Sequence, residues 1–200
     1  MKNNADITLV ICNYNRAKFI DRAIRSCLNQ FIMNRKIEVI VVDDASTDNS
    51  ISIIQEFNDE IKLHKIKKNK GVAFASNFGL KKATGQYWMR VDSDDFLNTY
   101  ACNFMTMILD ENPSIDFVYA DHYRVDTHGI KQERIRLDNQ KILYEHGAGI
   151  LFRTEILKKV GGYNNKLRNC EDYDLLLRLK KSGFKGYYLP VPLYRYYNSR

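Results

Sequence analysis

The feature that most constrains the fold is an alternation of apolar runs and helix-patterned segments in the first half of the chain. Short apolar, often β-branched runs predict buried strands at residues 7–11, 37–42, 61–66 and 87–91. Apolar residues at spacings of three and four predict helices near residues 19–28, 51–57 and 71–83. This alternation predicts an α/β fold with a mostly parallel central sheet and helices on both of its faces.

Polar clusters follow three of these predicted strands, at Cys12–Asn15, Asp43–Ser46 and Asp92–Asp95. In open parallel sheets, ligands bind beyond the carboxyl ends of the strands. We therefore expect the three clusters, although distant in sequence, to meet at one rim of the sheet and form a common site.

The last of these clusters carries three carboxylates within four positions. On an extended chain Asp92 and Asp94 point the same way, and their repulsion favours a nearby cation. Mg²⁺ or Mn²⁺ fits carboxylate oxygens combined with substrate phosphates. The alternative is a solvated acidic turn. An EF-hand is excluded, because positions five, six and twelve of the required loop are Phe96, Leu97 and Asn103.

The second half has a different pattern. We expect a helix near residues 100–108, a strand at 116–124, a mobile or irregular excursion over 125–145 and a strand after Gly149. A helix begins near Glu171, whose acidic neighbours Asp172 and Asp174 are also explained by helix capping alone. The aromatic segment 187–197 contains Pro190 and Pro192, which predicts an edge strand at best.

Size and composition indicate one folded domain over residues 1–200. The chain is 44% hydrophobic with three prolines, and no apolar run approaches the ~18 residues that cross a bilayer. The first residues lack the layout of a signal peptide, so we expect a cytoplasmic protein. Cysteines at 12, 27, 102 and 170 show no paired spacing and are expected to be free buried thiols, with disulfides or a zinc site as the alternative.

The net charge of +7 is unevenly placed. Residues 1–120 carry 15 Lys and Arg against 15 Asp and Glu, so the whole excess lies in residues 121–200. A basic half suggests an anionic neighbour, such as the headgroups at the inner face of a membrane or a phosphorylated acceptor. A merely solvated basic surface is the alternative. Nucleic acid is the weakest partner hypothesis, because no reading motif accompanies the charge.

A set of motifs spread over nearly the whole chain resembles the family-2 nucleotide-sugar glycosyltransferases of the Rossmann-like GT-A fold. In chain order, these motifs are Tyr14-Asn15, Val41–Asp48, Asn69-Lys70-Gly71, Asn77-Phe78-Gly79, Ala83–Tyr87, Val91–Asp95, Phe152-Arg153, Gly161-Gly162-Tyr163 and Glu171–Leu175. The resemblance implies an inverting, metal-dependent hexosyl- or N-acetylhexosaminyltransferase. Residues 1–97 would then bind the nucleotide sugar and residues 98–200 the acceptor.

The resemblance also implies roles for individual residues on the donor side. Cys12 and Tyr14 would contact the base, and Asp44 would accept a hydrogen bond from uracil. Asp92 would lie by the ribose, and Asp94 would bind the Mn²⁺ or Mg²⁺ that bridges the diphosphate.

Further roles concern the reacting groups. Asp95 would assist in donor binding by sharing either the ribose contact of Asp92 or the metal of Asp94, and Lys70 or Lys68 would offset charge on the leaving diphosphate. Asp172 would be the general base that takes a proton from an acceptor hydroxyl, with Glu171 on the acceptor side. The acceptor would be a glycan or a lipid-linked sugar in the synthesis of a polysaccharide, lipopolysaccharide or glycolipid.

Three positions depart from the family pattern. Ala45 stands where glycine is frequent, which predicts a tighter loop, and Ser76 stands where an arginine often precedes Asn77. A histidine that often follows the last aromatic strand is absent before Arg200. Either another group completes the metal shell, or the chain is a catalytic domain from a longer protein.

Two other functions fit parts of the sequence. A sugar nucleotidyltransferase has a similar sheet, but it needs a glycine-rich triphosphate loop, and Cys12–Arg16 contains no glycine. A non-catalytic module that only holds a nucleotide sugar is the second alternative. The presence of both Asp94 and Asp172 favours the enzyme.

Overall fold

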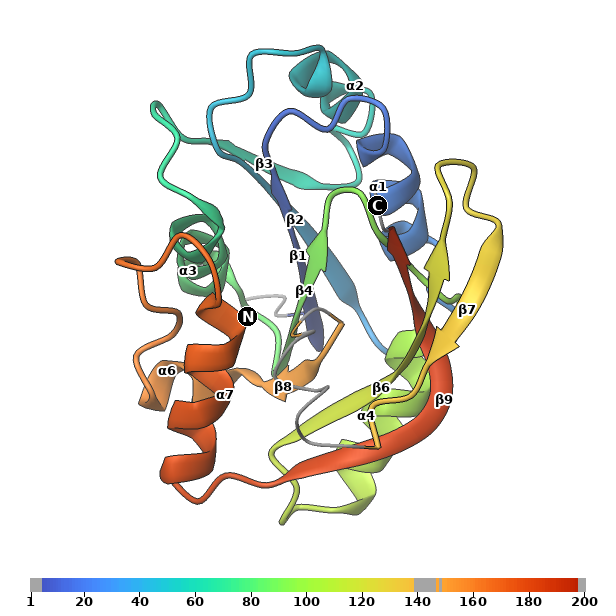
Figure 1. Ribbon diagram of the computed structural model, residues 1–200, viewed down its shortest axis with the longest axis vertical. Helices are drawn as coiled ribbons and strands as arrows, with labels where there is room; N and C mark the ends of the chain where they lie inside the picture. The colour runs from blue at the N-terminus through green and yellow to red at the C-terminus, as the bar shows by residue number, and fades with distance from the viewer. Residues whose placement is uncertain (1–4, 139–146, 148, 198–200) are drawn as a thin grey trace.

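A computed structural model describes residues 5–138, 147 and 149–197 of the chain (Figure 1). Its first half is the predicted strand–helix alternation. The parallel strands lie in the order β3-β2-β1-β4, with bounds β1 Ile7–Asn13, β2 Ile37–Asp43, β3 Lys62–Lys65 and β4 Tyr87–Asp92. The helices between them are α1 Ile20–Leu28, α2 Ser50–Gln55 and α3 Val72–Lys82.

The second half extends the same sheet with mixed pairing. Beyond β4 the order continues β8-β6-β9-β5, and β7 pairs with the outer part of β6. The bounds are β5 Phe96–Leu97, β6 Phe117–Val125, β7 Lys131–Ile135, β8 Leu151–Arg153 and β9 Gly186–Tyr197, with helices α4 Ala101–Glu111, α6 Thr154–Lys159 and α7 Glu171–Lys181. The result is a single-domain α/β fold whose nine described strands form a curled sheet (Figure 1).

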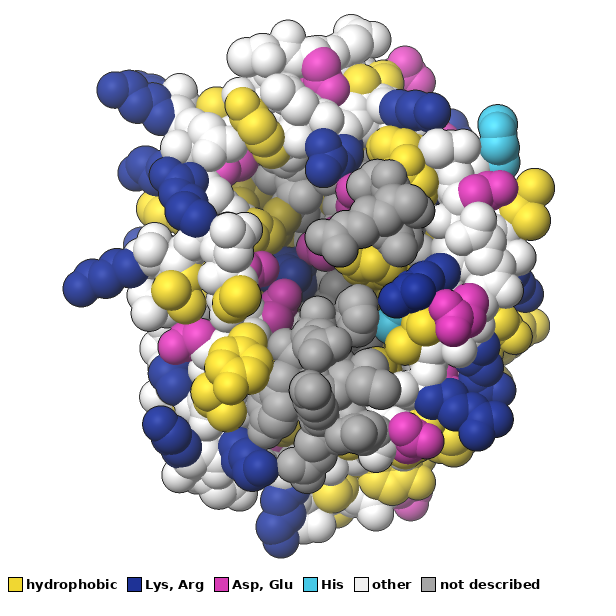
Figure 2. Space-filling view, viewed as in Figure 1, with side chains coloured by type: hydrophobic (Ala, Val, Ile, Leu, Met, Phe, Trp, Pro, Cys, Tyr) yellow, Lys and Arg dark blue, Asp and Glu magenta, His cyan; other side chains and the backbone are white. Residues whose placement is uncertain are grey.

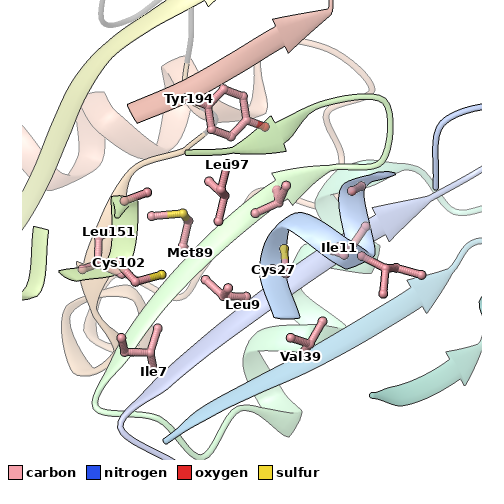
Figure 3. Close-up of a cluster of buried hydrophobic side chains, with 14 of the residues drawn as sticks. Ile7, Leu9, Ile11, Cys27, Val39, Met89, Leu97, Cys102, Leu151 and Tyr194 are labelled. Atoms are coloured by element: carbon pink, nitrogen blue, oxygen red, sulfur yellow. The ribbon is translucent and has the colours of Figure 1, made fainter. Parts of the chain in front are cut away.

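Alternating side chains of the central strands build a core on each face of the sheet. Ile7, Leu9 and Ile11 of β1 pack on the side of α1 and α4, with Cys27 and Cys102 in the same cluster (Figure 3). Val10, Ile40, Val42 and Trp88 face the other side, against α3, α6 and α7. Both faces of the central strands are buried, so they read as continuous apolar runs.

The structure corrects the expected irregular excursion over 125–145. Residues Lys131–Ile135 form β7, which pairs antiparallel with β6. The connecting turn is closed by the Gly129 amide, which donates to the Asp126 carbonyl at 3.0 Å. Short charged strands escape detection because their outer face carries no apolar alternation. Residues 139–146, also part of the excursion, lie outside the described residues.

The expectation that 187–197 is an edge strand needs correction at two residues, Tyr194 and Arg195, where β5 pairs with the second side of the strand. β9 lies between β6 and β5, in parallel register with β6. Its two prolines fall where the register shifts between Ala120 and His122, so no ladder hydrogen bond is required of Pro190 or Pro192. The prolines therefore lie in an irregular part of β9 that precedes the two residues paired with β5.

Two further expectations concern thiols and membranes. All four cysteines are free, as predicted, but the expected burial holds only for Cys27 and Cys102, since Cys12 is partly exposed and Cys170 is exposed. Within the described residues, no helix combines the length and the apolar character that a membrane crossing requires.

Candidate active site

The carboxyl ends of β1, β2 and β4 meet at one rim and line a cavity of about 590 Å³. Acidic side chains gather around a hollow near the middle of one face, with a basic side chain among them (Figure 2). The three predicted clusters contribute Cys12, Asn13, Tyr14, Asp44, Asp92, Ser93 and Asp94, and a later segment contributes Arg168, Asn169 and Glu171. The convergence expected from the strand order is therefore present.

One end of the cavity is organised by Asp44, whose side chain is buried with the residue 3% exposed. Its carboxylate accepts hydrogen bonds from the backbone amides of Lys70 at 2.9 Å and Gly71 at 2.7 Å. These bonds fix the carboxylate without a cationic partner and leave lone pairs for a ligand. Tyr14, 44% exposed, also lines this cavity.

Cys12 lies at the same rim, with its Sγ atom 3.4 Å from the Ser76 hydroxyl. Burial raises the pKa of the Cys12 thiol to about 12, so the side chain is a neutral thiol at neutral pH. Ser76 is fully buried and its hydroxyl donates to the Val72 carbonyl at 2.8 Å. Position 76 therefore supplies no cation to the cavity.

The loop after β2 is tight, as the alanine at position 45 predicts. Ala45 has a φ of 66°, in the left-handed region that favours glycine. Asp43 stabilises the loop by accepting from the Ser46 amide at 3.0 Å and the Ser46 hydroxyl at 2.6 Å. Asn13 donates to the same carboxylate at 2.8 Å, which ties the ends of β1 and β2 together.

Asp92 and Asp94 both line the cavity, but not because the chain stays extended. β4 ends at Asp92, and a turn follows in which the Asp95 amide donates to the Asp92 carbonyl at 3.0 Å. The turn, and not strand alternation, brings the two carboxylates to one side. Burial, with the negative charge of Asp92, raises the pKa of Asp94, and Arg16 opposes this rise from 3.0 Å.

Asp95 turns away from the cavity and is 1% exposed. One of its carboxylate oxygens accepts from the Tyr197 amide at 2.7 Å, which connects the acidic turn to β9. Burial and the charges of Asp92 and Asp94 raise the pKa of Asp95 well above its usual range. Its predicted part in donor binding stays a prediction, because the side chain is not among the residues that line the cavity.

The residue that connects Asp92, at the end of β4, to the start of α7 is Arg90 on β4, which the sequence analysis missed. It is 4% exposed and forms ion pairs with three carboxylates. Its guanidinium nitrogens lie 3.0 Å from Asp92, 3.1 Å from Glu171 and 2.7 Å from Asp172. An arginine inside an apolar strand, two residues before an aspartate, was the available signal, because both side chains then share one face.

Asp172 and Glu171 begin α7, and their carboxylates face Arg90 instead of capping the helix. Burial raises the pKa of Asp172 to about 6, against the lowering effect of Arg90. The Asp172 side chain remains 18% exposed, so one oxygen can meet a ligand while the other pairs with Arg90. Gly147 packs against it, since a Cβ there would lie 2.1 Å from the Asp172 Cβ.

The side chain of Lys70, which was predicted to offset charge on the diphosphate, points away from the cavity. Lys70 holds Asp44 through its backbone, while its ammonium lies 4.4 Å from the centre of the Phe74 ring and does not line the cavity. A cationic role for the Lys70 or Lys68 side chain stays a prediction.

The donor set at the acidic turn fits a hard divalent cation. Among the described residues, no group of three or more His, Cys, Asp or Glu side chains forms a ready-made metal site. Asp92 and Asp94 supply two carboxylates, and Mg²⁺ or Mn²⁺ commonly binds one or two carboxylates together with substrate phosphates. A site completed by the substrate is therefore consistent with these residues.

Residues 8–161 match the family model described as glycosyl transferase family 2. The chain belongs to this family. It is 30% identical over 188 residues to chondroitin synthase from Escherichia coli, a match that covers 88% of this chain and 27% of that protein. The family-2 chain thus spans about a quarter of that relative's length.

Solved structures share the fold over almost the whole chain. The structure of residues 1–349 of Staphylococcus aureus TarS in complex with UDP has a TM-score of 0.80 and 25% identity, covering 97% of this chain and 61% of that one. The Pyrobaculum calidifontis mannosyltransferase PcManGT, solved with GDP-Man and Mn²⁺, has a TM-score of 0.75 and 19% identity, covering 98% and 57%. This second likeness concerns the fold alone.

Proposed function

We propose that this glycosyltransferase transfers a sugar from a UDP-sugar to an acceptor hydroxyl with inversion at the anomeric carbon. The observation that carries the proposal is the Arg90 bridge, which holds Asp172 at one end and Asp92 of the cavity at the other. A candidate base and a candidate donor site thus share one buried guanidinium. The presence of UDP in the TarS structure supports the choice of nucleotide.

In the proposed reaction, the Asp172 carboxylate takes the proton of the acceptor hydroxyl. The acceptor oxygen forms a bond to the anomeric carbon as the bond from that carbon to the diphosphate oxygen breaks. The bonding electrons leave with the nucleoside diphosphate. Attack from the face opposite the leaving group inverts the configuration in one step.

On the donor side, Asp44 would accept the uracil N–H, with Tyr14 and Cys12 beside the base and Asp92 at the ribose. Tyr14, Cys12, Asp44 and Asp92 all line the cavity. Asp94 would hold Mn²⁺ or Mg²⁺, which when bound supplies positive charge to the diphosphate. Arg16 lies 3.0 Å from one carboxylate oxygen of Asp94 and would keep this contact while the other oxygen binds the metal.

Residues 98–200 would bind the acceptor, with Glu171 on that side of Asp172. We propose a growing glycan or a lipid-linked sugar as the acceptor, and the chondroitin synthase relative supports polysaccharide synthesis. The basic excess in residues 121–200 supports contact with the anionic inner face of a membrane, and we expect no nucleic acid partner. Equal flotation with anionic and neutral liposomes would contradict the membrane contact.

The function is tested by calorimetry of UDP-sugars, with GDP-mannose for comparison, in Mn²⁺ and in EDTA. We expect UDP-sugars to bind in the presence of Mn²⁺ and to release UDP slowly by transfer to water. NMR of the glycoside formed with a candidate acceptor should show the inverted anomer, because a glycoside, unlike a free sugar, does not interconvert its anomers in water. Binding without any turnover on donors and candidate acceptors would favour the non-catalytic module, and no binding of any nucleotide sugar would refute both.

A further inference from the structure

The charges that line the cavity are unequal. Four carboxylates line it, from Asp44, Asp92, Asp94 and Glu171, against three guanidinium groups, from Arg16, Arg90 and Arg168. A nucleotide diphosphate would bring further negative charge to a cavity that already has an excess of it. The Mn²⁺ or Mg²⁺ proposed at Asp94 would supply part of the opposing charge, and a side-chain cation that faces the phosphates would add to it.

Two of the three arginines already have carboxylate partners. Arg16 pairs with Asp94 at 3.0 Å. Arg90 is buried and surrounded by three carboxylates, so it cannot turn toward a ligand without leaving them unpaired. Among the cavity-lining residues that the structure describes, Arg168 is the one cation without an ion pair.

Arg168 is exposed, and its contacts are neutral. One of its guanidinium nitrogens lies 3.3 Å from the Asn69 side-chain oxygen, to which it donates a hydrogen bond. The same guanidinium lies against Gly71, where a Cβ would come within 2.9 Å of it. The absence of a side chain at Gly71 thus gives the arginine room beside the start of α3.

Arg168 also borders two adjoining hollows of the site. It lines the main cavity together with Asp44, and it lines the adjoining hollow together with Glu171 and Asp172. In a nucleotide sugar the diphosphate lies between the base and the anomeric carbon. Arg168 borders both the cavity that contains the proposed base-binding residue Asp44 and the hollow that contains the proposed catalytic residue Asp172.

We infer that Arg168 binds the donor diphosphate and stabilises its negative charge as the sugar leaves. The planar guanidinium can donate two parallel hydrogen bonds to phosphate oxygens, which a lysine cannot do. This inference rests on the proposed function, because it assigns one contact within the proposed donor site. It also supplies the cation that position 76 lacks.

The test compares the binding of uridine, UMP and UDP to the wild-type chain, Arg168→Gln and Arg168→Lys by calorimetry, at fixed Mn²⁺ and ionic strength. We expect Arg168→Gln to weaken UDP binding about tenfold and to leave uridine binding unchanged. The UDP affinity of Arg168→Lys should lie between that of the wild-type chain and that of Arg168→Gln. Lys166→Gln is the matched control, since it removes a positive charge from the same loop at a residue that does not line the cavity.

Each outcome decides the inference. Equal losses for uridine and UDP would assign Arg168 to the base and overturn it, as would unchanged UDP binding in Arg168→Gln. If Lys166→Gln weakens UDP binding as much as Arg168→Gln does, the effect comes from the overall charge of the loop, and the inference about Arg168 is overturned. If the wild-type chain binds none of the three ligands, the proposed function itself fails, which is a distinguishable result.

Discussion

The two ends of the site hold their carboxylates in different ways. At the Asp44 end, the oxygens are fixed by backbone amides of nearby loops. At the Asp172 end, Glu171 and Asp172 depend on Arg90, more than 80 positions away in the sequence. Local backbone bonds need no buried counter-charge, whereas a shared guanidinium couples every carboxylate that it holds. Changes at the first end should therefore stay local, whereas removal of the shared guanidinium at the second should affect all three carboxylates that it holds.

The largest expected effect is the loss of turnover in Asp172→Asn. Removing the proposed general base should lower turnover by about 10²–10⁴-fold, while UDP-sugar affinity stays near the wild-type value. Steady-state kinetics and calorimetry on the same preparation measure both. Asp174→Asn is the matched control, because Asp174 lies in the same helical turn but pairs with Arg178 at 2.8 Å. Equal losses in both variants would contradict a catalytic role.

The coupling of Asp92, Glu171 and Asp172 through one guanidinium is removed most directly by Arg90→Met. Three carboxylates would lose their shared cation in a buried place, so we expect the free energy of unfolding to fall by about 3–5 kcal/mol. Thermal and urea unfolding measure this loss. Adding Glu171→Gln and Asp172→Asn should recover much of it, since neutral side chains tolerate the absence of a cation. No recovery in the triple variant would show that the loss is one of packing.

The other end is tested by Asp44→Asn. Its new amide group would meet the backbone N–H of Lys70 or Gly71, and the acceptor for uracil would be lost. We expect uridine and UDP to bind about 10–100-fold more weakly, a loss of about 1–3 kcal/mol. The exposed Asp59→Asn controls for net charge. Weaker UDP binding with unchanged uridine binding would place the base elsewhere.

The pH dependence of turnover should report the Asp172 end alone. With a pKa of about 6, the Asp172 carboxyl is ionised and able to accept a proton above pH 7, and it is protonated and inactive well below pH 6. We expect the rate at saturating donor and Mn²⁺ to be about tenfold lower at pH 5 than at the plateau. Arg90 lowers the pKa of Asp172. A lysine at position 90 whose ammonium lies farther from Asp172 should therefore move the acid limb of the profile to higher pH. A profile that Arg90→Lys leaves in place would oppose this coupling.

The smallest effect is expected from Ala45→Gly. Glycine adopts the left-handed φ of 66° without strain, although it also makes the unfolded chain more flexible. The two effects should leave a net gain of about 0.5–1 kcal/mol in unfolding free energy, with no change at the Asp172 end. A loss of stability in urea unfolding would mean that the Ala45 methyl group contributes packing that outweighs the strain.

The sequence alone determined the strand–helix order of the first half, because buried parallel strands and amphipathic helices have distinct apolar periods. It also placed Cys12, Asp44, Asp92 and Asp94 at one rim, since parallel strands bring their carboxyl ends together. The family resemblance is confirmed, while the roles of single residues remain proposals.

Only the tertiary structure decided which partners these groups have. Arg90 meets Glu171 and Asp172 because β4 and the start of α7 come together in space, a contact between positions about 80 apart that no local pattern encodes. The pairing of β9 with β5 at Tyr194 and Arg195 has the same long-range origin, and a bulge in the β6 pairing takes its prolines. Local propensity fixes what a segment can form, and long-range packing fixes what each side chain touches.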